Sequence, residues 1–212
     1  MLRWYGRRAL SLPAYTRLGV DERRRQLLDT SAQVFTERPY DAVSMSEIAT
    51  RAGISKGLLY HYFSSKEELF GATLETAARE LAETIAPDPG LPPPARVSAS
   101  VDAFIDWIEV HEASYVRLIE EAGSVTAVRD LLARVRRQSA EMIATQAVAG
   151  DAPRVLVTAG LGWLGFLDAA CLDWLRDRHM TRDRLRDLLI GTLFGSLMAA
   201  AAVDPAIELK LD

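Results

Sequence analysis

The sequence predicts an all-α protein, and three observations carry this prediction. Apolar residues recur at helical spacing along most of the chain, and no alternating strand pattern appears. Serine or threonine stands just before several of these periodic segments, where it can cap a helix. Glycine and proline separate the segments, as expected where helices end. With 212 residues, 49% of them hydrophobic and 25% charged, the composition is that of a folded globular protein.

The first third of the chain predicts two short helices joined by a tight turn. Ser44 and Glu47 fit a capping box, in which the serine hydroxyl accepts from the backbone of Glu47 and the carboxylate reaches back. The first short helix therefore starts at Met45. Gly53 ends it, because glycine adopts the left-handed backbone conformation without strain. Ser55 caps the second helix, which is two turns long.

Longer helices flank this pair. Residues 20–37 place apolar side chains on one face and acidic residues at the start, which predicts a helix. Ser65 begins a second capping box, and its helix runs to about residue 85, before the Pro/Gly-rich loop at 87–94. Further helices are expected near residues 97–111, 115–121, 125–149, 153–178 and 181–203, with Pro153 at a first helical position and Thr181 as a cap.

Charge is distributed unevenly between the two ends of the chain. The net charge is −4, but residues 1–70 hold 11 Lys and Arg against 8 Asp and Glu, so they carry +3 and the remainder carries −7. A basic head on an acidic body directs one end toward phosphate. The basic side chains of residues 1–20 are expected either to lie in a DNA minor groove or to form a tail without a specific role; they are Arg3, Arg7, Arg8 and Arg17, with Trp4 among them.

The helix pair forms a plausible helix-turn-helix unit. Its second helix, SKGLLYHY with the serine cap, concentrates hydrogen-bonding groups, one cation and two tyrosines on two turns. Such a surface suits contacts with phosphates and base edges in the major groove better than it suits a core.

Residues 35–69, FTERPYDAVSMSEIATRAGISKGLLYHYFSSKEEL, closely resemble the DNA-binding domain of the tetracycline-repressor (TetR) family. The resemblance rests on the Ala-Gly-aliphatic-Ser turn, the Tyr-x-x-Phe motif and the Lys-Glu pair that follows it. Pro39 departs from the glycine that many members carry, and it should stiffen the turn. The resemblance implies a basic arm at residues 1–20, a DNA-binding domain at 21–81 with its motif at 44–63, and a helical ligand-binding and dimerisation bundle at 95–212.

The same resemblance implies a role for each DNA-binding residue. Ser44 would donate to a phosphate, Lys66 would grip another, and Arg51 would join them. The side chains facing the groove would come from the second helix of the pair, with Gly57 allowing close approach to the bases. The expected DNA-binding set is Ser44, Arg51, Ser55, Lys56, Gly57, Leu58, Tyr60, His61, Tyr62 and Lys66.

An effector cavity is expected in the C-terminal half, where aromatic residues gather on several predicted helices. The candidates combine apolar surface with a few polar groups, as ligand sites do. The alternative is that they simply form a core. The set is Phe104, Trp107, Ile108, His111, Tyr115, Met142, Trp163, Phe166 and Cys171. The nearby run of Arg134, Arg136 and Arg137 is interpreted as a solvated helix face.

The last two helices are expected to pair across a two-fold axis, as they do in the TetR family. Gly191, Gly195 and Ala199 fall at i, i+4 and i+8, and small residues on one stripe permit close helix approach. Trp174 is assigned to the same dimer interface. Packing within one chain is the alternative for this stripe.

The predicted function is a ligand-responsive DNA-binding transcriptional regulator, with repression as the expected outcome. Its expected partners are double-stranded DNA, a second copy of the chain and a largely apolar small molecule. The alternative is a ligand-independent regulator controlled by a partner protein or by abundance. The sequence lacks the spacings of common catalytic motifs, so neither enzyme activity nor a cofactor is expected. Its longest uncharged apolar stretches, 13 and 16 residues, predict buried helices rather than membrane spans, and the single cysteine fits the cytoplasm.

Overall fold

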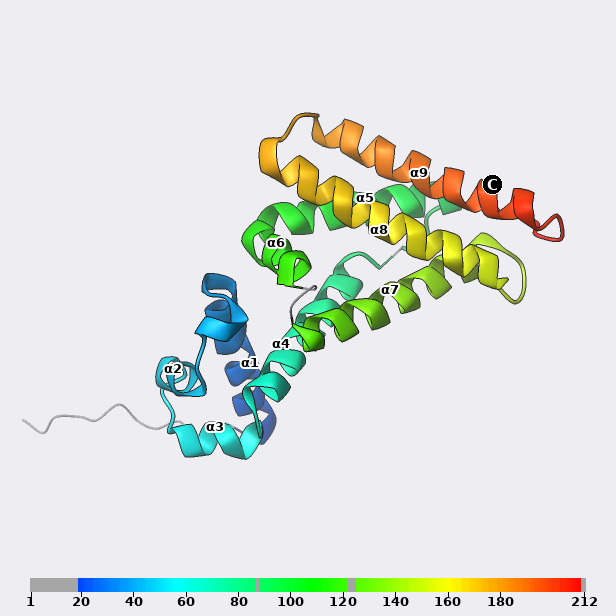
Figure 1. Cartoon of the computed structure of the whole chain (residues 1–212). Coiled ribbons are helices and arrows are strands. Elements are labelled where there is room, and N and C mark those ends of the chain that lie inside the picture. Colours follow the sequence, from blue (N-terminus) through cyan, green and yellow to red (C-terminus); the bar gives the residue numbers. More distant parts are fainter. Residues whose placement is uncertain (1–18, 87, 122–124, 211–212) are drawn as a thin grey trace, which may run out of the picture.

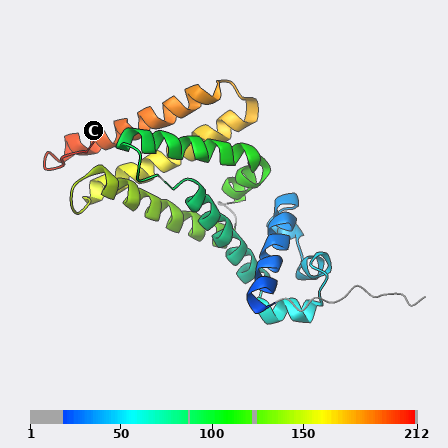
Figure 2. The same ribbon diagram turned by 180° about the vertical axis from the view of Figure 1, so that it is seen from behind.

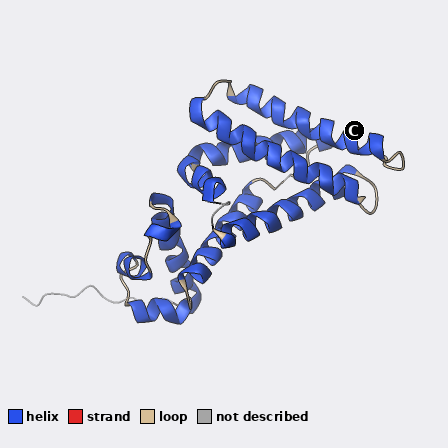
Figure 3. Ribbon diagram, in the orientation of Figure 1, coloured by secondary structure: helices blue, strands red, loops and turns tan. Residues whose placement is uncertain are grey.

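The computed structural model describes residues 19–86, 88–121 and 125–210. These residues form nine α-helices and one 3-10 helix, and among them no strand is present beyond an isolated bridge between Val148 and Leu209 (Figure 3). The predicted all-α class is therefore confirmed.

The first five elements make up the part of the chain that contains the expected helix-turn-helix. They are α1 (Val20–Glu37), η1 (Tyr40–Ala42), α2 (Met45–Arg51), α3 (Lys56–Tyr62) and α4 (Lys66–Thr84). The first of these helices has the bounds that its apolar period predicts, while η1 was not expected.

Serine caps start three of these helices as predicted. The Oγ atoms of Ser44, Ser55 and Ser65 each accept a backbone N–H from three residues later, at 3.0–3.2 Å. The reciprocal half of the first capping box is absent, because the Glu47 carboxylate accepts from Arg38 Nη1 at 2.9 Å instead. Such caps satisfy backbone donors that a helix leaves unpaired at its N-terminus.

Five longer elements form the C-terminal half, with α8 and α9 side by side (Figure 1). They are α5 (Pro93–Val110), α6 (Glu112–Glu121), α7 (Thr126–Ala147), α8 (Arg154–Asp177) and α9 (Arg182–Val203). Thr181 caps α9 as expected. Pro153 is the N-cap of α8 rather than its first helical residue, one position from the prediction.

The described chain has two apolar cores joined by the long helix α4 (Figures 1 and 2). One core gathers side chains of α1 to α4, including the fully buried Leu59 and Phe63. The other lies among α5 to α9. Val128 of α7 is fully buried in the first core, so the C-terminal half of the chain packs into the N-terminal part. Packing on that core ties the two domains together directly.

Candidate nucleic-acid interface

A glycine turn fixes the angle between α2 and α3. Gly53 has φ +66°, and its N–H donates to the carbonyl of Thr50 at 3.1 Å while Ile54 N–H donates to that of Ala49 at 3.0 Å. These two bonds are the Schellman pattern that closes a helix C-terminus. A side chain with a Cβ would be strained at this φ, so the predicted role of Gly53 in ending the helix is confirmed.

The α3 helix is held by its inner face and presents its outer face to solvent. Leu59 is fully buried, while Lys56, Gly57 and His61 are exposed and Tyr60 is 43% exposed. A Cβ built on Gly57 would meet no atom within 4 Å, so this position leaves open space beside the backbone. Leu58 and Tyr62, also in the expected DNA-binding set, are half-buried. The buried Leu59 therefore anchors a helix whose polar groups face solvent.

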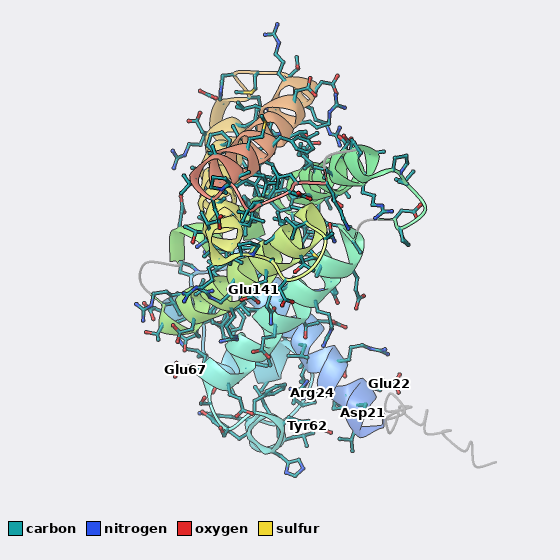
Figure 4. The ribbon with its side chains drawn as sticks, turned by 90° about the vertical axis from the view of Figure 1, so that its right-hand side faces the viewer. Asp21, Glu22, Arg24, Tyr62, Glu67 and Glu141 are labelled. Atoms are coloured by element: carbon teal, nitrogen blue, oxygen red, sulfur yellow. The ribbon has the colours of Figure 1, made fainter. Side chains whose placement is uncertain are left out.

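Aromatic rings and cations meet around α3. The Nζ of Lys56 lies 5.7 Å from the centroid of the Tyr60 ring, one turn away on the same helix. Arg24 of α1 lies over the Phe63 ring at 5.1 Å, and Figure 4 places Arg24 and Tyr62 near each other at this end of the molecule. Arg24 was not in the expected set, and only its place in the basic run of α1 marked it in the sequence. These contacts orient cations without burying them.

Ser44 and Arg51 lie at the two ends of α2 and differ in which of their hydrogen-bonding groups already have a partner in the protein. The Ser44 hydroxyl accepts from the backbone, so its own hydrogen remains able to donate to a phosphate. Arg51 Nη1 donates to Glu37 Oε1 at 2.9 Å, and this hydrogen bond holds the pKa of the Glu37 carboxyl below its usual range. Arg51 therefore links α2 to α1 in this structure.

Lys66 contacts the backbone of the turn before α2. Its Nζ donates to the carbonyl oxygens of Tyr40 at 2.9 Å and Val43 at 3.1 Å. The ammonium therefore faces the protein rather than open solvent. The expected basic arm, residues 1–20, lies outside the described residues up to residue 18, and so do Arg3, Trp4, Arg7, Arg8 and Arg17.

The nine expected effector residues divide between the C-terminal core and the helix surface. Phe104, Ile108, Tyr115, Trp163 and Cys171 are buried together in the C-terminal core. Three others, His111, Met142 and Phe166, are exposed on the helix surface. The ninth residue, Trp107, is half-buried, and the His111 ring stacks on it with 4.6 Å between the ring centroids. The side chains of Met142 and Phe166 are thus corrected from cavity lining to outer helix surface. Apolar character alone did not reveal which face of a helix they occupy.

Two hollows form elsewhere on the described surface. One, of about 600 Å³, lies between α6 and Pro39. The other, of about 470 Å³, lies between α7 and α8 near Arg137 and Arg154. None of the nine expected effector residues lines either hollow.

A polar network that the sequence did not predict crosses the C-terminal core. Tyr115 Oη donates to Asp168 Oδ1 at 2.9 Å, and Arg136 Nε donates to Asp168 Oδ2 at 3.0 Å. Burial, followed by the charge of Asp168, raises the pKa of Tyr115 well above its usual range. Arg136 is therefore half-buried and paired, whereas Arg134 and Arg137 of the same run are exposed, as expected. The network joins α6, α7 and α8.

The expected dimer residues divide into two groups. Gly191, Gly195 and Ala199 are exposed on α9, and a Cβ built on either glycine meets nothing within 4 Å. Trp174 is buried within the protomer, where its Nε1 donates to the carbonyl of Met180 at 2.8 Å. Trp174 is thus corrected to a core residue, because its large ring and N–H both find partners in the same chain.

On the neighbouring helix α8, Gly162, Gly165 and Phe166 are exposed as well. By length and composition alone, α8 and α9 are apolar enough to cross a membrane, yet only 28% and 22% of their most apolar windows are buried inside the protomer. Core helices of soluble proteins meet the same criterion. In Figure 2 α5 crosses one side of the α8–α9 pair, and in Figure 1 the other side has no described helix over it.

Comparisons with known proteins point in one direction. A family model described as "Bacterial regulatory proteins, tetR family" matches residues 27–73, which include α2, α3 and the turn between them. A second, described as "Tetracyclin repressor-like, C-terminal domain", matches residues 93–195.

Two similar curated proteins are named as transcription regulators. The chain is 43% identical over 117 residues to the HTH-type transcriptional activator FasR of Mycolicibacterium smegmatis, covering 52% of this chain and 51% of that protein. It is 34% identical over 110 residues to the HTH-type transcriptional repressor KstR2 of Mycobacterium tuberculosis, covering 49% of this chain and 52% of that protein. The matches span about half the length of these relatives.

Solved structures agree over most of the chain. A tetR-family transcriptional regulator from Streptomyces coelicolor superposes with a TM-score of 0.75 and 29% identity, covering 89% of this chain and 86% of that one. A TetR-like regulator from Rhodococcus sp. RHA1 gives 0.60 and 27%, covering 86% and 99%. With two matching family models and these neighbours, the chain belongs to the TetR family of DNA-binding transcriptional regulators.

Proposed function

We propose that this regulator acts as a homodimer, binds an inverted-repeat operator through α3 and is released from it by a small, largely apolar effector. The observation that carries the DNA-binding part is the two-turn helix α3, which is anchored by the buried Leu59 and exposes Lys56, Gly57, Tyr60 and His61. A short helix with such a polar outer face fits the major groove.

The uncovered face of α8 and α9 supports a dimer. Leu188 is 40% and Met198 60% exposed on α9, beside the open glycines. Exposed apolar side chains beside small residues on one helix suit a contact with another copy, and a face paired with itself is self-complementary under two-fold symmetry. Two α3 helices related by such an axis would read two inverted half-sites about one DNA turn, roughly 34–36 Å, apart.

Contacts between the domains supply a route for regulation. Thr36 Oγ1 of α1 lies 2.9 Å from Ser114 Oγ of α6, and Arg134 of α7 donates to Glu75 of α4 at 3.0 Å. Both α6 and α7 also belong to the network around Asp168. An effector that separated these helices would shift the DNA-binding part of each protomer, and the two recognition helices would then lose the spacing of the half-sites.

The second candidate function is a ligand-independent regulator, and the filled C-terminal core favours it. The expected effector residues Phe104, Ile108 and Cys171 pack together in the C-terminal core, and none of the nine lines either of the two hollows described above. An effector-responsive protein must then open this core on binding, whereas a protein controlled by a partner or by abundance need not.

Two experiments test the proposed function. DNA fragments retained by the purified protein from a random library should share an inverted repeat, and a reporter carrying that repeat in its promoter should be repressed in cells. Retained fragments with no common sequence contradict the DNA-binding proposal, and activation of the reporter contradicts repression. We place this action in the cytoplasm, where DNA-binding regulators of bacteria meet the chromosome.

A panel of apolar small molecules, screened by the shift in melting temperature, separates the two modes of regulation. An effector should weaken operator binding, typically by about 5- to 150-fold, and operator DNA must weaken effector binding by the same factor. A compound whose affinity is the same with and without operator is no effector. If no compound in the panel shows the reciprocal effect, the ligand-independent candidate is favoured.

A further inference from the structure

Lys66, the first residue of α4, makes an unusual set of contacts for a lysine beside a DNA-binding helix. Besides its two hydrogen bonds to the carbonyl oxygens of Tyr40 and Val43, its Nζ lies 4.2 Å from the centroid of the Tyr40 ring. The side chain is half-buried. Two of the three ammonium hydrogens are therefore directed at the protein's own backbone.

The two carbonyls belong to a turn that leads directly into the helix-turn-helix. Tyr40 begins η1, its carbonyl also accepts the N–H of Val43 at 3.2 Å, and Val43 immediately precedes Ser44, the N-cap of α2. Carbonyls at the end of a helical turn carry partial negative charge, and a lysine side chain is a suitable donor to them. Lys66 thus fastens the start of α4 to the entrance of α2.

The Tyr40 ring extends this attachment into the apolar core. Its centroid lies 4.7 Å from that of Phe70 on α4 and 6.2 Å from that of Phe35 on α1. The lysine on one side of the ring and the two phenylalanine rings around it hold η1 between α1 and α4. By contrast, Lys56 is exposed, and its ammonium lies 5.7 Å from the Tyr60 ring on its own helix.

We infer that Lys66 is a positioning residue, which locks η1 and the start of α2 onto α4, whether or not its third ammonium hydrogen also reaches a phosphate. The part of this inference that concerns DNA rests on the proposed function. Because α4 continues toward the C-terminal domain and pairs with α7 through Glu75 and Arg134, the lock makes the helix-turn-helix follow α4 when α4 moves. Without the contacts of Lys66, we expect a movement of α4 to be transmitted less completely to α2.

Amide hydrogen exchange on the full-length protein without DNA tests the lock itself. The variants are Lys66→Ala and, as a matched control, Lys56→Ala. In Lys66→Ala the peptide spanning residues 40–51 should exchange at least about 5-fold faster than in the unmodified protein, because the turn loses two charge-assisted hydrogen bonds. In Lys56→Ala the same peptide should be unchanged. Equal exchange in Lys66→Ala and the unmodified protein overturns the inference.

A variant that keeps a hydrogen-bond donor at position 66 shows whether faster exchange comes from the lost hydrogen bonds or from general unfolding of the protein. Lys66→Gln carries an amide N–H2 on a shorter stem, so it should exchange at a rate between those of Lys66→Ala and the unmodified protein. If Lys66→Ala does not fold, the same comparison is made with Lys66→Gln, whose peptide over residues 40–51 must then exchange faster than that of Lys56→Ala. A Gln variant indistinguishable from Lys56→Ala in that peptide also overturns the inference.

The dependence of DNA affinity on salt separates positioning from phosphate binding. Affinities are measured for one retained fragment and for random DNA, at several salt concentrations. Loss of a phosphate contact reduces the slope of log affinity against log salt by about 0.9 per contact and weakens both DNAs alike. A positioning residue instead weakens the retained fragment by at least about 10-fold more than random DNA, because only the retained fragment depends on the orientation of the helix pair. A reduced slope in Lys66→Ala, with equal loss on both DNAs, overturns the inference.

The hydrogen-exchange experiment and the DNA-affinity experiment can fail independently of each other. If the unmodified protein retains no fragment, the proposed function fails while the exchange experiment still decides whether Lys66 locks the turn.

Discussion

The network around Asp168 predicts a large and specific loss of stability when its carboxylate is removed. The Asp168 side chain is 15% exposed, and it accepts from Tyr115 at 2.9 Å and from Arg136 Nε at 3.0 Å. Asp168→Ala leaves a buried phenol and a guanidinium that is 33% exposed without their partner. Breaking a fully buried pair from one side costs about 3–5 kcal/mol, and because Arg136 is partly solvated we expect a loss near the lower end, about 3 kcal/mol.

Three further variants separate the contributions of the individual hydrogen bonds to this loss of stability. Tyr115→Phe removes one hydrogen bond to a charged group and should cost about 1.5–3 kcal/mol. In the double variant Tyr115→Phe/Asp168→Ala the phenylalanine no longer lacks a partner, so the total should be smaller than the sum of the single losses. Asp168→Asn keeps the shape and should fall between Tyr115→Phe and Asp168→Ala.

Urea unfolding at one fixed protein concentration measures these free energies, because the stability of a dimer depends on concentration. The reasoning is refuted if Asp168→Ala costs less than about 1 kcal/mol, or if the losses of the two single variants add fully.

Three further predictions concern the dimer face, the buried thiol and base recognition. Gly195→Arg should turn a dimer into a monomer in sedimentation, because a long charged side chain disrupts a close helix contact. Gly195→Ala, which fills open space, should leave the dimer intact; a dimer of undiminished stability in the Arg variant would place the interface elsewhere. Burial raises the pKa of Cys171 to about 12, so a thiol reagent at pH 8 should modify it only after unfolding. Rapid labelling of the folded protein would contradict the burial of this thiol. Because the thiol ionises at lower pH in the unfolded chain than in the folded one, it lowers the free energy of unfolding as pH rises above about 9. Lys56→Ala should change sequence preference at one base pair, at about 1–3 kcal/mol of discrimination, and an equal loss on all sequences would make Lys56 a phosphate contact.

Most helices could be predicted because their signals are local. The caps at Ser44, Ser55 and Thr181 and the break at Gly53 depend on backbone groups a few residues away, and the structure contains each of them. The short helix η1 was missed because its stabilising partner, Lys66, lies 26 residues from Tyr40 along the chain. No local pattern marks such a contact.

Side-chain roles in the C-terminal domain were harder to predict for the same reason. Periodicity shows that a helix has an apolar face, but α8 is apolar nearly all round, so Trp174 and Phe166 could not be assigned to the core and the outer face. The pairing of Arg136 with Asp168 was missed because the two residues are 32 positions apart along the chain. In both cases the deciding information is which helices are neighbours in space.

The assignment of α3 rests on firmer ground than that of the effector site. Residues 44–63 combine a glycine turn, two serine caps and a polar outer face, and in the structure these local signals define α2, the turn after it and the exposed face of α3. The effector residues, by contrast, were chosen for aromatic character, which a closed core also requires.

The central claim, that two copies of this chain read an inverted repeat through their α3 helices, is tested most directly by changing the spacing of the half-sites in a retained fragment. We measure the affinity of the 23.4-kDa chain for the original fragment and for one lengthened between its half-sites by half a DNA turn, about 5 base pairs. The account predicts two protomers on the original fragment and at least about 100-fold weaker binding to the lengthened one, because the second helix then faces the wrong side of the duplex. Equal affinity for both fragments, or one protomer bound to each, would contradict it.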